Sequence, residues 1–263
     1  MGANQFWESE NPVAIAHRGG TESAPENSLA AFSAAAALGF KYLETDVHVT
    51  ADGVLVAFHD ESLDRVTDRT GLIAELPYSE VAAARMAGDL PIPTMDELFD
   101  AFPDIRFNID VKADDAVVPF AETLRRHNAI DRVCVAAFSE RRMRRVRSLV
   151  GPRLCSSASP REVTALLGVA NIRSSTGIPA PGGASTRATP RYQCLQVPER
   201  HGSVKIVTRR FLAAAHERGL KVQVWTIDDA EDMNRLLDMG VDGIFTDHPS
   251  VLKSVLIERG QWD

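Results

Sequence analysis

The chain has 263 residues, of which 44% are hydrophobic and 25% are charged, and its formal net charge is -7. This length suits one large domain, and the composition is that of an ordinary globular protein. The negative net charge gives no electrostatic support to nucleic-acid binding, so an anionic ligand must be held by local positive groups.

Targeting features point to the cytoplasm. Residues 1–11 lack a basic start followed by an apolar run, so no secretory signal is expected. No apolar stretch reaches the roughly 18 residues of a transmembrane segment. Cys134, Cys155 and Cys194 are odd in number and far apart in the sequence, without the paired spacing of metal or redox motifs. They are predicted to be reduced, partly buried thiols of a cytoplasmic protein.

Apolar, strand-like runs alternate with helical patterns along the chain. Strands are predicted at residues 13–17, 42–49, 54–59, 106–112, 133–138, 154–157, 194–197, 221–227 and 243–246. Helices are predicted at residues 28–38, 95–102, 117–127, 140–149, 161–167, 209–218 and 230–238, several of them after the capping residues Asn27, Thr94, Ser139, Thr208 and Asp229. A strand-then-helix unit repeated about eight times predicts an α/β fold, the (β/α)8 TIM barrel, which typically needs about 250 residues. A doubly wound sheet is the less favoured alternative, because His17-Arg18-Gly19-Gly20 is a poor glycine-rich phosphate loop.

Two segments interrupt this alternation within a single domain that spans residues 1–263. Ala51-Asp52-Gly53 is a tight turn, so residues 54–59 are predicted to fold back as a hairpin strand. Residues 60–105 then form a small insertion after the second strand. Residues 171–193 are rich in small and polar residues and are predicted to form a flexible loop at one rim, without secondary structure.

Acidic residues gather at predicted strand ends. Glu44 and Asp46 are two apart on one strand and therefore share a face, and Asp110 and Lys112 do so on another. In a barrel these faces converge at the C-terminal mouth, where three carboxylates would repel each other unless a cation joined them. Carboxylate ligands suit a hard ion such as Mg²⁺ or Ca²⁺. A set of surface ion pairs is the alternative, but burial in apolar strands would then be costly.

Basic and aromatic residues occupy neighbouring strand ends. His17 and His59 can exchange protons near neutral pH, and Arg18 and Lys112 can hold phosphate oxygens. Trp225 is expected to form a wall for the carbon part of a substrate, or else to be a core residue.

The remaining polar motifs are interpreted mainly as structural. Glu26 and Asn27 are expected to shape the first loop and cap its helix, and for these two residues a structural and a functional role are given equal weight. Asp247-His248-Pro249 is interpreted as a turn that closes the barrel. The other histidines are interpreted as surface or packing residues: His48, His127, His201 and His216.

The chain resembles the bacterial cytoplasmic glycerophosphodiester phosphodiesterases. The motifs that carry this resemblance span nearly the whole chain: His17-Arg18-Gly19, Pro25-Glu26-Asn27-Ser28, Ala31-Phe32, Glu44-Thr45-Asp46-Val47, Thr50-Ala51-Asp52-Gly53, His59-Asp60, Leu63-Asp64-Arg65, Thr67, Trp225-Thr226 and Gly243-Ile244-Phe245-Thr246-Asp247. The resemblance implies a barrel with an insertion at about 60–105. It also implies a reaction that converts a glycerophosphodiester and water to sn-glycerol 3-phosphate and an alcohol.

The resemblance also implies roles for individual residues. Glu44, Asp46 and the acid on the third strand would hold one divalent cation, Mg²⁺ or Ca²⁺. His17 and His59 would act as acid and base, and Arg18 and Lys112 would bind the phosphate. The third acid is usually glutamate, whereas Asp110 is one methylene shorter.

Two alternatives remain open at this point. Sphingomyelinase D-like phospholipases use aspartate at the ligand that corresponds to Asp110, which keeps a lysophospholipase D activity on lysolipids as one alternative. The other is an inactive binding barrel, against which the intact candidate residues argue. The expected partner is a small glycerophosphodiester, with no nucleic acid and no transmembrane segment. Head-group preference and oligomeric state are not predicted.

Overall fold

A parallel barrel organises the protein. The computed structural model describes residues 6–7, 11–176 and 191–262, with the side chains of 171–176 excepted. Within these residues, eight parallel strands lie side by side in the order β8-β7-β6-β2-β1-β13-β12-β9. Their bounds are Val13–Ala16 (β1), Tyr42–Val49 (β2), Arg106–Val111 (β6), Val133–Ala136 (β7), Cys155–Ser156 (β8), Cys194–Pro198 (β9), Lys221–Trp225 (β12) and Gly243–Thr246 (β13). A single parallel bridge between Ser157 and Cys194 joins β8 to β9 and completes the barrel. The predicted (β/α)8 fold is confirmed.

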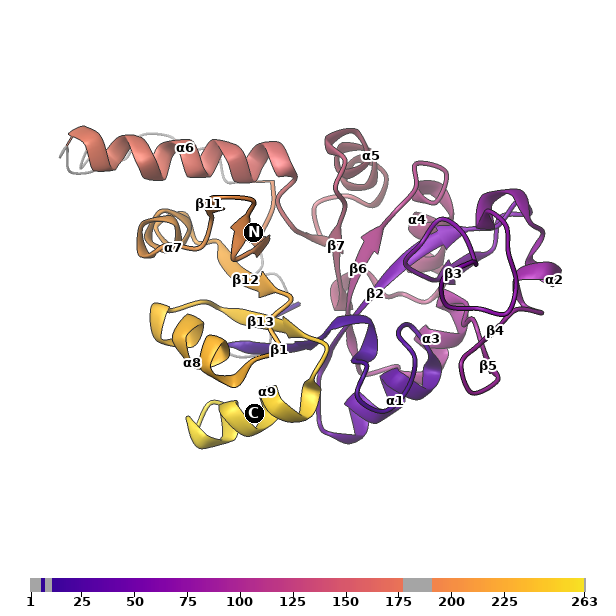
Figure 1. Ribbon diagram of the computed structural model, residues 1–263. Coiled ribbons are helices and arrows are strands. Elements are labelled where there is room, and N and C mark those ends of the chain that lie inside the picture. The colour runs from indigo at the N-terminus through magenta and orange to yellow at the C-terminus, as the bar shows by residue number, and fades with distance from the viewer. Residues whose placement is uncertain (1–5, 8–10, 177–190, 263) are drawn as a thin grey trace.

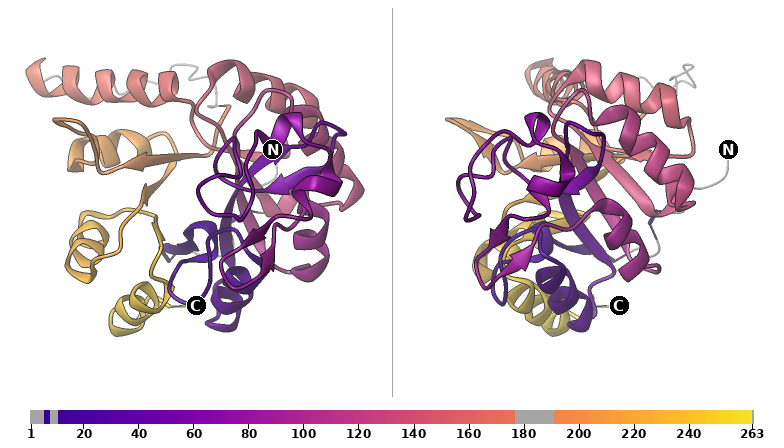
Figure 2. Two further views of the ribbon diagram at one scale, coloured as in Figure 1. Left: turned by 45° about the vertical axis from the view of Figure 1, so that its right-hand side comes forward. Right: turned by 90° about the vertical axis from the view of Figure 1, so that its right-hand side faces the viewer.

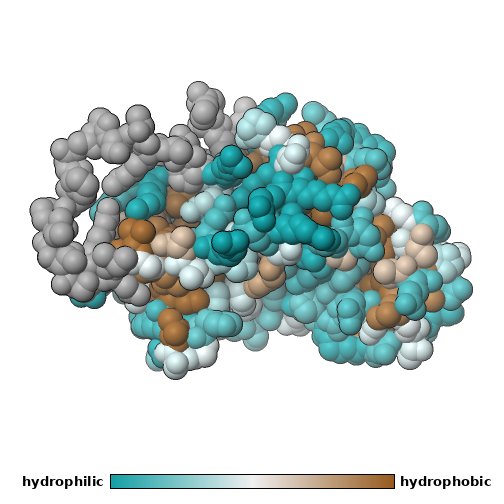
Figure 3. Space-filling view, turned by 90° about the horizontal axis from the view of Figure 1, so that it is seen from above, coloured by the Kyte–Doolittle hydropathy of each residue, from teal (hydrophilic) through white to brown (hydrophobic). Residues whose placement is uncertain are grey.

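Helices surround these strands (Figure 1). They are Leu29–Ala37 (α1), Met95–Ala101 (α3), Val117–Arg126 (α4), Glu140–Val150 (α5), Pro160–Thr176 (α6), Arg209–His216 (α7), Ala230–Met239 (α8) and Pro249–Glu258 (α9). The prediction missed α9, because the segment from Asp247 to Pro249 was interpreted only as a turn. Pro249 is the first residue of this helix, where its fixed φ favours helix initiation. Seen from above, the face that carries α5 is hydrophilic over its middle (Figure 3), in agreement with the arginine-rich sequence of α5.

Side-chain caps fix the starts of several helices. The predicted caps Thr94, Ser139, Thr208 and Asp229 each accept a hydrogen bond from a backbone N–H of the first turn. The fifth prediction, Asn27 as the cap of α1, is wrong by one residue. Ser28 is the N-cap, and its Oγ accepts from Ala31 N at 3.1 Å. Asn27 has a φ of 57° and directs its side chain into the barrel mouth instead.

Alternation along the strands divides the core into two layers. On β6, Phe107, Ile109 and Val111 belong to the large hydrophobic layer between the strands and the helices. Asn108 and Asp110 lie on the opposite face of the strand, which lines the barrel interior. A second apolar cluster fills the lower part of that interior: Phe6, Val13, Ile15, Tyr42, Cys134, Cys155, Cys194 and Phe245. The cysteines are therefore fully buried, rather than partly buried as predicted, and they lie close together.

The segment after β2 forms a compact unit at one side of the barrel (Figures 1 and 2). β3 (Leu55–Ala57) folds back antiparallel onto β2, as the tight turn predicts. The unit continues with η2 (Ile73–Glu75), α2 (Tyr78–Val81), β4 (Arg85–Met86) and β5 (Leu90–Pro91), and it has a small apolar core of its own. The short elements η1 (His17–Gly19), η3 (Ile130–Arg132), β10 (Arg200–His201) and β11 (Val204–Lys205) complete the described structure.

The predicted rim loop at 171–193 is in part helical. α6 continues to Thr176, well past the predicted end at 167, and β9 begins at Cys194. Residues 177–190 of that predicted loop lie outside the described residues. None of the helices in the described part of the chain has the length and apolar character needed to span a membrane.

Candidate active site

The predicted acids lie on two neighbouring strands toward the C-terminal mouth of the barrel. Strand register pairs Asp46 of β2 with Asp110 of β6, and Glu44 with Asn108 one layer deeper. All three acids are buried. The two-residue spacing within β2 therefore brings Glu44 and Asp46 to one face, and the parallel register adds Asp110.

Positive charge compensates only part of this acidic cluster. Lys112 Nζ lies 2.9 Å from Asp46 Oδ1 and 2.7 Å from Asp110 Oδ2. The other oxygen of Asp110 is buried and has no hydrogen-bond partner among the described residues. Burial raises the pKa of Asp110, although Lys112 opposes this effect. Burial and the neighbouring Asp46 raise the pKa of Glu44 to about 7. Burial therefore disfavours the charged forms of Glu44 and Asp110.

His17 is held by a carboxylate from the other end of the chain. Its Nδ1 lies 2.8 Å from Asp247 Oδ1, and its Nε2 lies 3.9 Å from Glu44 Oε2. Burial opposes protonation of His17, but Glu44 and Asp247 outweigh it and raise the pKa of the imidazole. Asp228 accepts the backbone N–H of Asp247 at 2.8 Å and thereby fixes its position. Our interpretation of Asp247 as a simple closing turn was incomplete, because its side chain belongs to the site.

His59 has an equivalent arrangement. Its Nδ1 lies 2.6 Å from Asp60 Oδ1, and Arg65 binds both oxygens of Asp60. Arg65 is the main cause that lowers the pKa of Asp60, to about 2. His48 donates from Nε2 to the backbone carbonyl of His59 at 3.1 Å, which matches its predicted packing role. Each candidate histidine thus has an aspartate at Nδ1, and its Nε2 is left for other interactions.

The first loop positions groups around Asp46. Arg18 Nε lies 3.2 Å from Asp46 Oδ2, and Arg18 also donates to Glu26 Oε1 at 3.0 Å. Asn27 Nδ2 donates to the same oxygen of Asp46 at 3.2 Å. The turn of this loop needs glycine, because a Cβ on Gly19 would lie 2.9 Å from the ring of Phe32 and the φ of Gly19 is +84°. Glu26 and Asn27 therefore hold Arg18 and Asp46 in place at the site.

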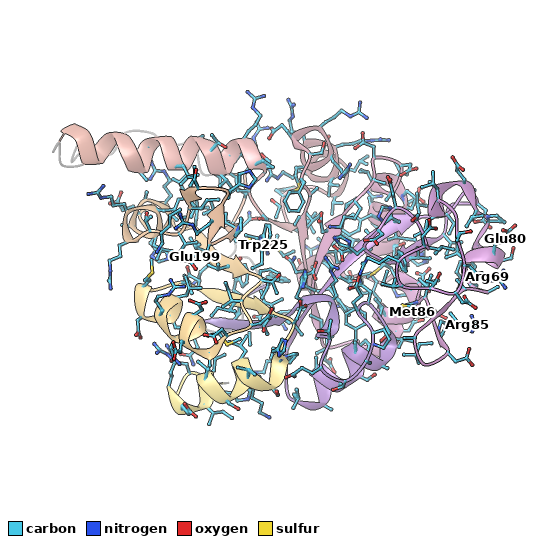
Figure 4. All side chains as sticks on the ribbon, in the orientation of Figure 1. Arg69, Glu80, Arg85, Met86, Glu199 and Trp225 are labelled. Atoms are coloured by element: carbon cyan, nitrogen blue, oxygen red, sulfur yellow. The ribbon has the colours of Figure 1, made fainter. Side chains whose placement is uncertain are left out.

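An aromatic pair stands on the opposite side of the mouth. Trp225, at the end of β12, packs partly against the interior cluster and points toward the middle of the molecule (Figure 4). Its ring centroid is 5.9 Å from that of Phe138, whose side chain is 66% exposed. Lys112 Nζ lies 5.8 Å from the Phe138 ring. The sequence analysis missed Phe138, although its position at the end of the predicted strand 133–138 was a usable signal.

A surface hollow of about 890 Å³ opens beside the site, between the first loop and the insertion. Glu26 and Arg65 line it on the side of the site, and Arg85 and Met86 line it from the insertion (Figure 4). The hollow therefore borders the candidate site through Glu26 and Arg65, which contact Arg18 and Asp60.

Comparison with known proteins agrees with this geometry. Residues 17–251 match the model of the glycerophosphoryl diester phosphodiesterase family. A protein of Mycobacterium tuberculosis named "Probable glycerophosphodiester phosphodiesterase 2" is 40% identical over 261 residues, which cover 98% of this chain and 96% of the relative. The glycerophosphodiester phosphodiesterase of Caldanaerobacter subterraneus is 29% identical, over 94% of this chain and 99% of the relative. An Oleispira antarctica phosphodiesterase, solved in complex with its product sn-glycerol-3-phosphate, superimposes with a TM-score of 0.76 at 24% identity, over 94% of this chain and 97% of that one.

Proposed function

Because the chain belongs to the glycerophosphoryl diester phosphodiesterase family, we propose that it hydrolyses glycerophosphodiesters to sn-glycerol 3-phosphate and an alcohol. The observation that carries the proposal is one rim with two histidines, each held at Nδ1 by an aspartate, beside three buried acids. General acid–base groups and an acidic cluster are what cleavage of a phosphodiester requires. The names of the two bacterial relatives and the product in the Oleispira antarctica structure support the same reaction.

The three acids would hold one divalent cation, Mg²⁺ or Ca²⁺. Two features support this part of the proposal: the buried oxygen of Asp110 without a partner, and the raised pKa of Glu44. The unpartnered oxygen of Asp110 is open to a ligand bond, a bound cation would offset the burial that raises the pKa of Glu44, and carboxylate oxygens are the donors that hard cations prefer. When bound, such an ion supplies Lewis-acid stabilisation of a charged phosphate oxygen.

His17 and His59 would move the protons of the reaction. An aspartate at Nδ1 can only accept, so each imidazole donates its Nδ1–H and keeps Nε2 for proton transfer. The raised pKa of His17 extends its protonated form to higher pH. One histidine takes a proton from the nucleophile while the other gives one to the leaving oxygen, which is the usual division of work between two such groups.

Arg18 and Lys112 would bind the phosphate. Both lie at the mouth and are anchored by Asp46, so their positions are set before substrate arrives. A guanidinium and an ammonium together provide several charge-assisted donors for phosphate oxygens. Trp225 and Phe138 would contact the carbon part of the substrate, and the hollow beside Glu26 would receive the leaving alcohol.

The nucleophile in our proposal is the glycerol hydroxyl next to the phosphorylated carbon. Its attack on phosphorus expels the alcohol and leaves a cyclic phosphate, which water then opens while the two histidines exchange roles. Intramolecular attack gains from proximity, up to about 7–11 kcal/mol in favourable cases. A 2-deoxy substrate analogue separates this route from direct attack by water. Normal turnover of the analogue would exclude the cyclic route, and a collapse of turnover with retained binding would support it.

A substrate panel tests the proposed function itself. Glycerophosphocholine, glycerophosphoethanolamine and glycerophosphoglycerol would be assayed through a coupled glycerol-3-phosphate readout, with lysophosphatidylcholine as the lipid control. We expect turnover of all three diesters with modest differences, and poor cleavage of bis(p-nitrophenyl) phosphate, which lacks glycerol. A clear preference for the lysolipid would favour a lysophospholipase D instead.

A cytoplasmic location completes the proposal. Cys134, Cys155 and Cys194 are free thiols in the structure, and thiols persist in reducing compartments. Fractionation of the native cells, followed by detection of the protein with an antibody, would test this location.

A further inference from the structure

Three thiols meet inside the barrel, below the candidate active site. Cys134 and Cys155 occupy paired positions on β7 and β8, and the bridge between Ser157 and Cys194 brings the third thiol beside them. The cysteines are 0–1% exposed. The Sγ atoms of Cys134 and Cys194 are 3.7 Å apart, and the three sulfurs all lie within 4.8 Å of one another.

The separation of the Cys134 and Cys194 sulfurs matches the distance between two sulfur ligands of one metal ion. Two sulfurs bound to tetrahedral zinc at ~2.3 Å lie about 3.8 Å apart. A disulfide would need a separation of about 2.0 Å, and the three cysteines are free in the structure. Simple packing of cysteines as small apolar residues would not require three sulfurs from three strands to converge.

The groups around the thiols separate this cluster from the acidic site. Gln196 donates to Asn108 Oδ1 at 2.6 Å, and its Nε2 lies 4.0 Å from Cys134 Sγ. Its register partner on the next strand, Gln223, is fully buried, and neither polar atom of its amide has a partner among the described residues. A layer of amides therefore lies next to the soft sulfur donors, whereas the hard oxygen donors are at the mouth. The two donor sets favour different classes of cation.

Metal binding at this position would release the thiol protons into solvent, because the thiolate is the form of cysteine that binds metal ions.

We propose that Cys134, Cys155 and Cys194 form a structural zinc site that ties together β7, β8 and β9. The site lies where β8 meets β9 through one bridge only, so the ion would reinforce the closure of the barrel. A water molecule or a neighbouring amide oxygen would complete the coordination. Since the thiols are closed off from solvent, the ion enters while the chain folds and not afterwards.

Refolding of the full chain tests this site with Cd²⁺ and Zn²⁺ as probes. The reduced protein would be unfolded, refolded with either ion or with a chelator, and passed through a desalting column that contains a weak chelator. We expect one retained ion per chain, an ultraviolet thiolate-to-cadmium charge-transfer band, and a higher thermal midpoint than that of the chelator-refolded protein. Native protein that has not been unfolded should take up little added Cd²⁺ at the thiols.

Matched variants assign the signals to these sulfurs. Cys155→Ala should lose the charge-transfer band and the gain in thermal midpoint, but it should keep its circular dichroism and its phosphodiesterase activity. Asp110→Asn alters the mouth and should leave the band unchanged. Correctly folded wild-type protein with no band and no retained ion would overturn the proposal. A band that persists in Cys155→Ala would overturn it as well. None of these outcomes depends on which substrate the enzyme cleaves.

Discussion

Replacement of Asp247 by asparagine tests whether the His17–Asp247 pair works as a unit. The substitution keeps the size of the side chain but removes the charge that faces His17 Nδ1 at 2.8 Å. Hydrogen bonds to a charged group are worth about 1.5–3 kcal/mol, and one pKa unit corresponds to about 1.4 kcal/mol. Asp247 is 30% exposed, so solvent weakens the interaction, and the lower end of this range of about 1.5–3 kcal/mol applies. We therefore expect the protonated form of His17 to lose about 1.5 kcal/mol of stabilisation, so that the pKa of His17 falls.

The direction in which the pH profile moves follows from the interaction between His17 and Asp247. Glu44 and Asp247 raise the pKa of His17, so the protonated form persists to higher pH in the wild-type protein. Without the Asp247 charge, the imidazole loses its proton at lower pH, and the limb of the activity profile that depends on protonated His17 moves toward acid. The asparagine amide can also accept or donate, which permits the wrong tautomer of His17. Turnover should then fall by about 100-fold or more, the usual scale for a general acid–base group.

The assay is the pH dependence of kcat and kcat/KM with saturating cation, together with an NMR titration of the imidazole. Asp96→Asn is the matched control, because Asp96 contacts His127 Nε2 at 2.5 Å on the protein surface, away from the site. The control should leave the activity profile unchanged. Wild-type turnover and an unshifted profile in Asp247→Asn would refute the idea that Asp247 positions His17.

Three further predictions concern the remaining groups of the site. Chelation should abolish phosphodiesterase activity, and added Mg²⁺ or Ca²⁺ should restore it; full activity after chelation would exclude the metal. Asp110→Asn should weaken cation binding measured by calorimetry, whereas Asp110→Glu should retain part of the activity. His17→Ala and His59→Ala should each reduce kcat by about 100-fold or more, with little change in thermal midpoint. The loss of kcat in the double variant should be smaller than the product of the two single losses. A near-normal rate in either single variant would remove that residue from the mechanism. Phe138→Ala should raise KM for glycerophosphocholine with little effect on stability, since this ring is exposed; an unchanged KM would show that the ring does not touch substrate.

Sequence patterns predicted much of the fold because the relevant forces are local. The alternation of apolar runs with helical patterns indicated the barrel, and four of the five proposed caps are N-caps in the structure. The two-residue spacing of Glu44 and Asp46 placed them on one face, since side chains alternate along a strand. The exception was Asn27, which bonds to Asp46 across the mouth rather than to the backbone of its own helix. Only the packed barrel offers it that partner.

Tertiary structure alone decided which distant groups meet. His17 and Asp247 are 230 positions apart, and they pair because barrel closure puts β13 next to β1, with Ala16 opposite Thr246. Cys134 and Cys194 are 60 positions apart and come together in the same way, through the joining of β7, β8 and β9. Local patterns report which face of a strand a residue occupies and where a helix begins. The register between strands depends on how the whole sheet closes, and no short segment of the chain contains that information.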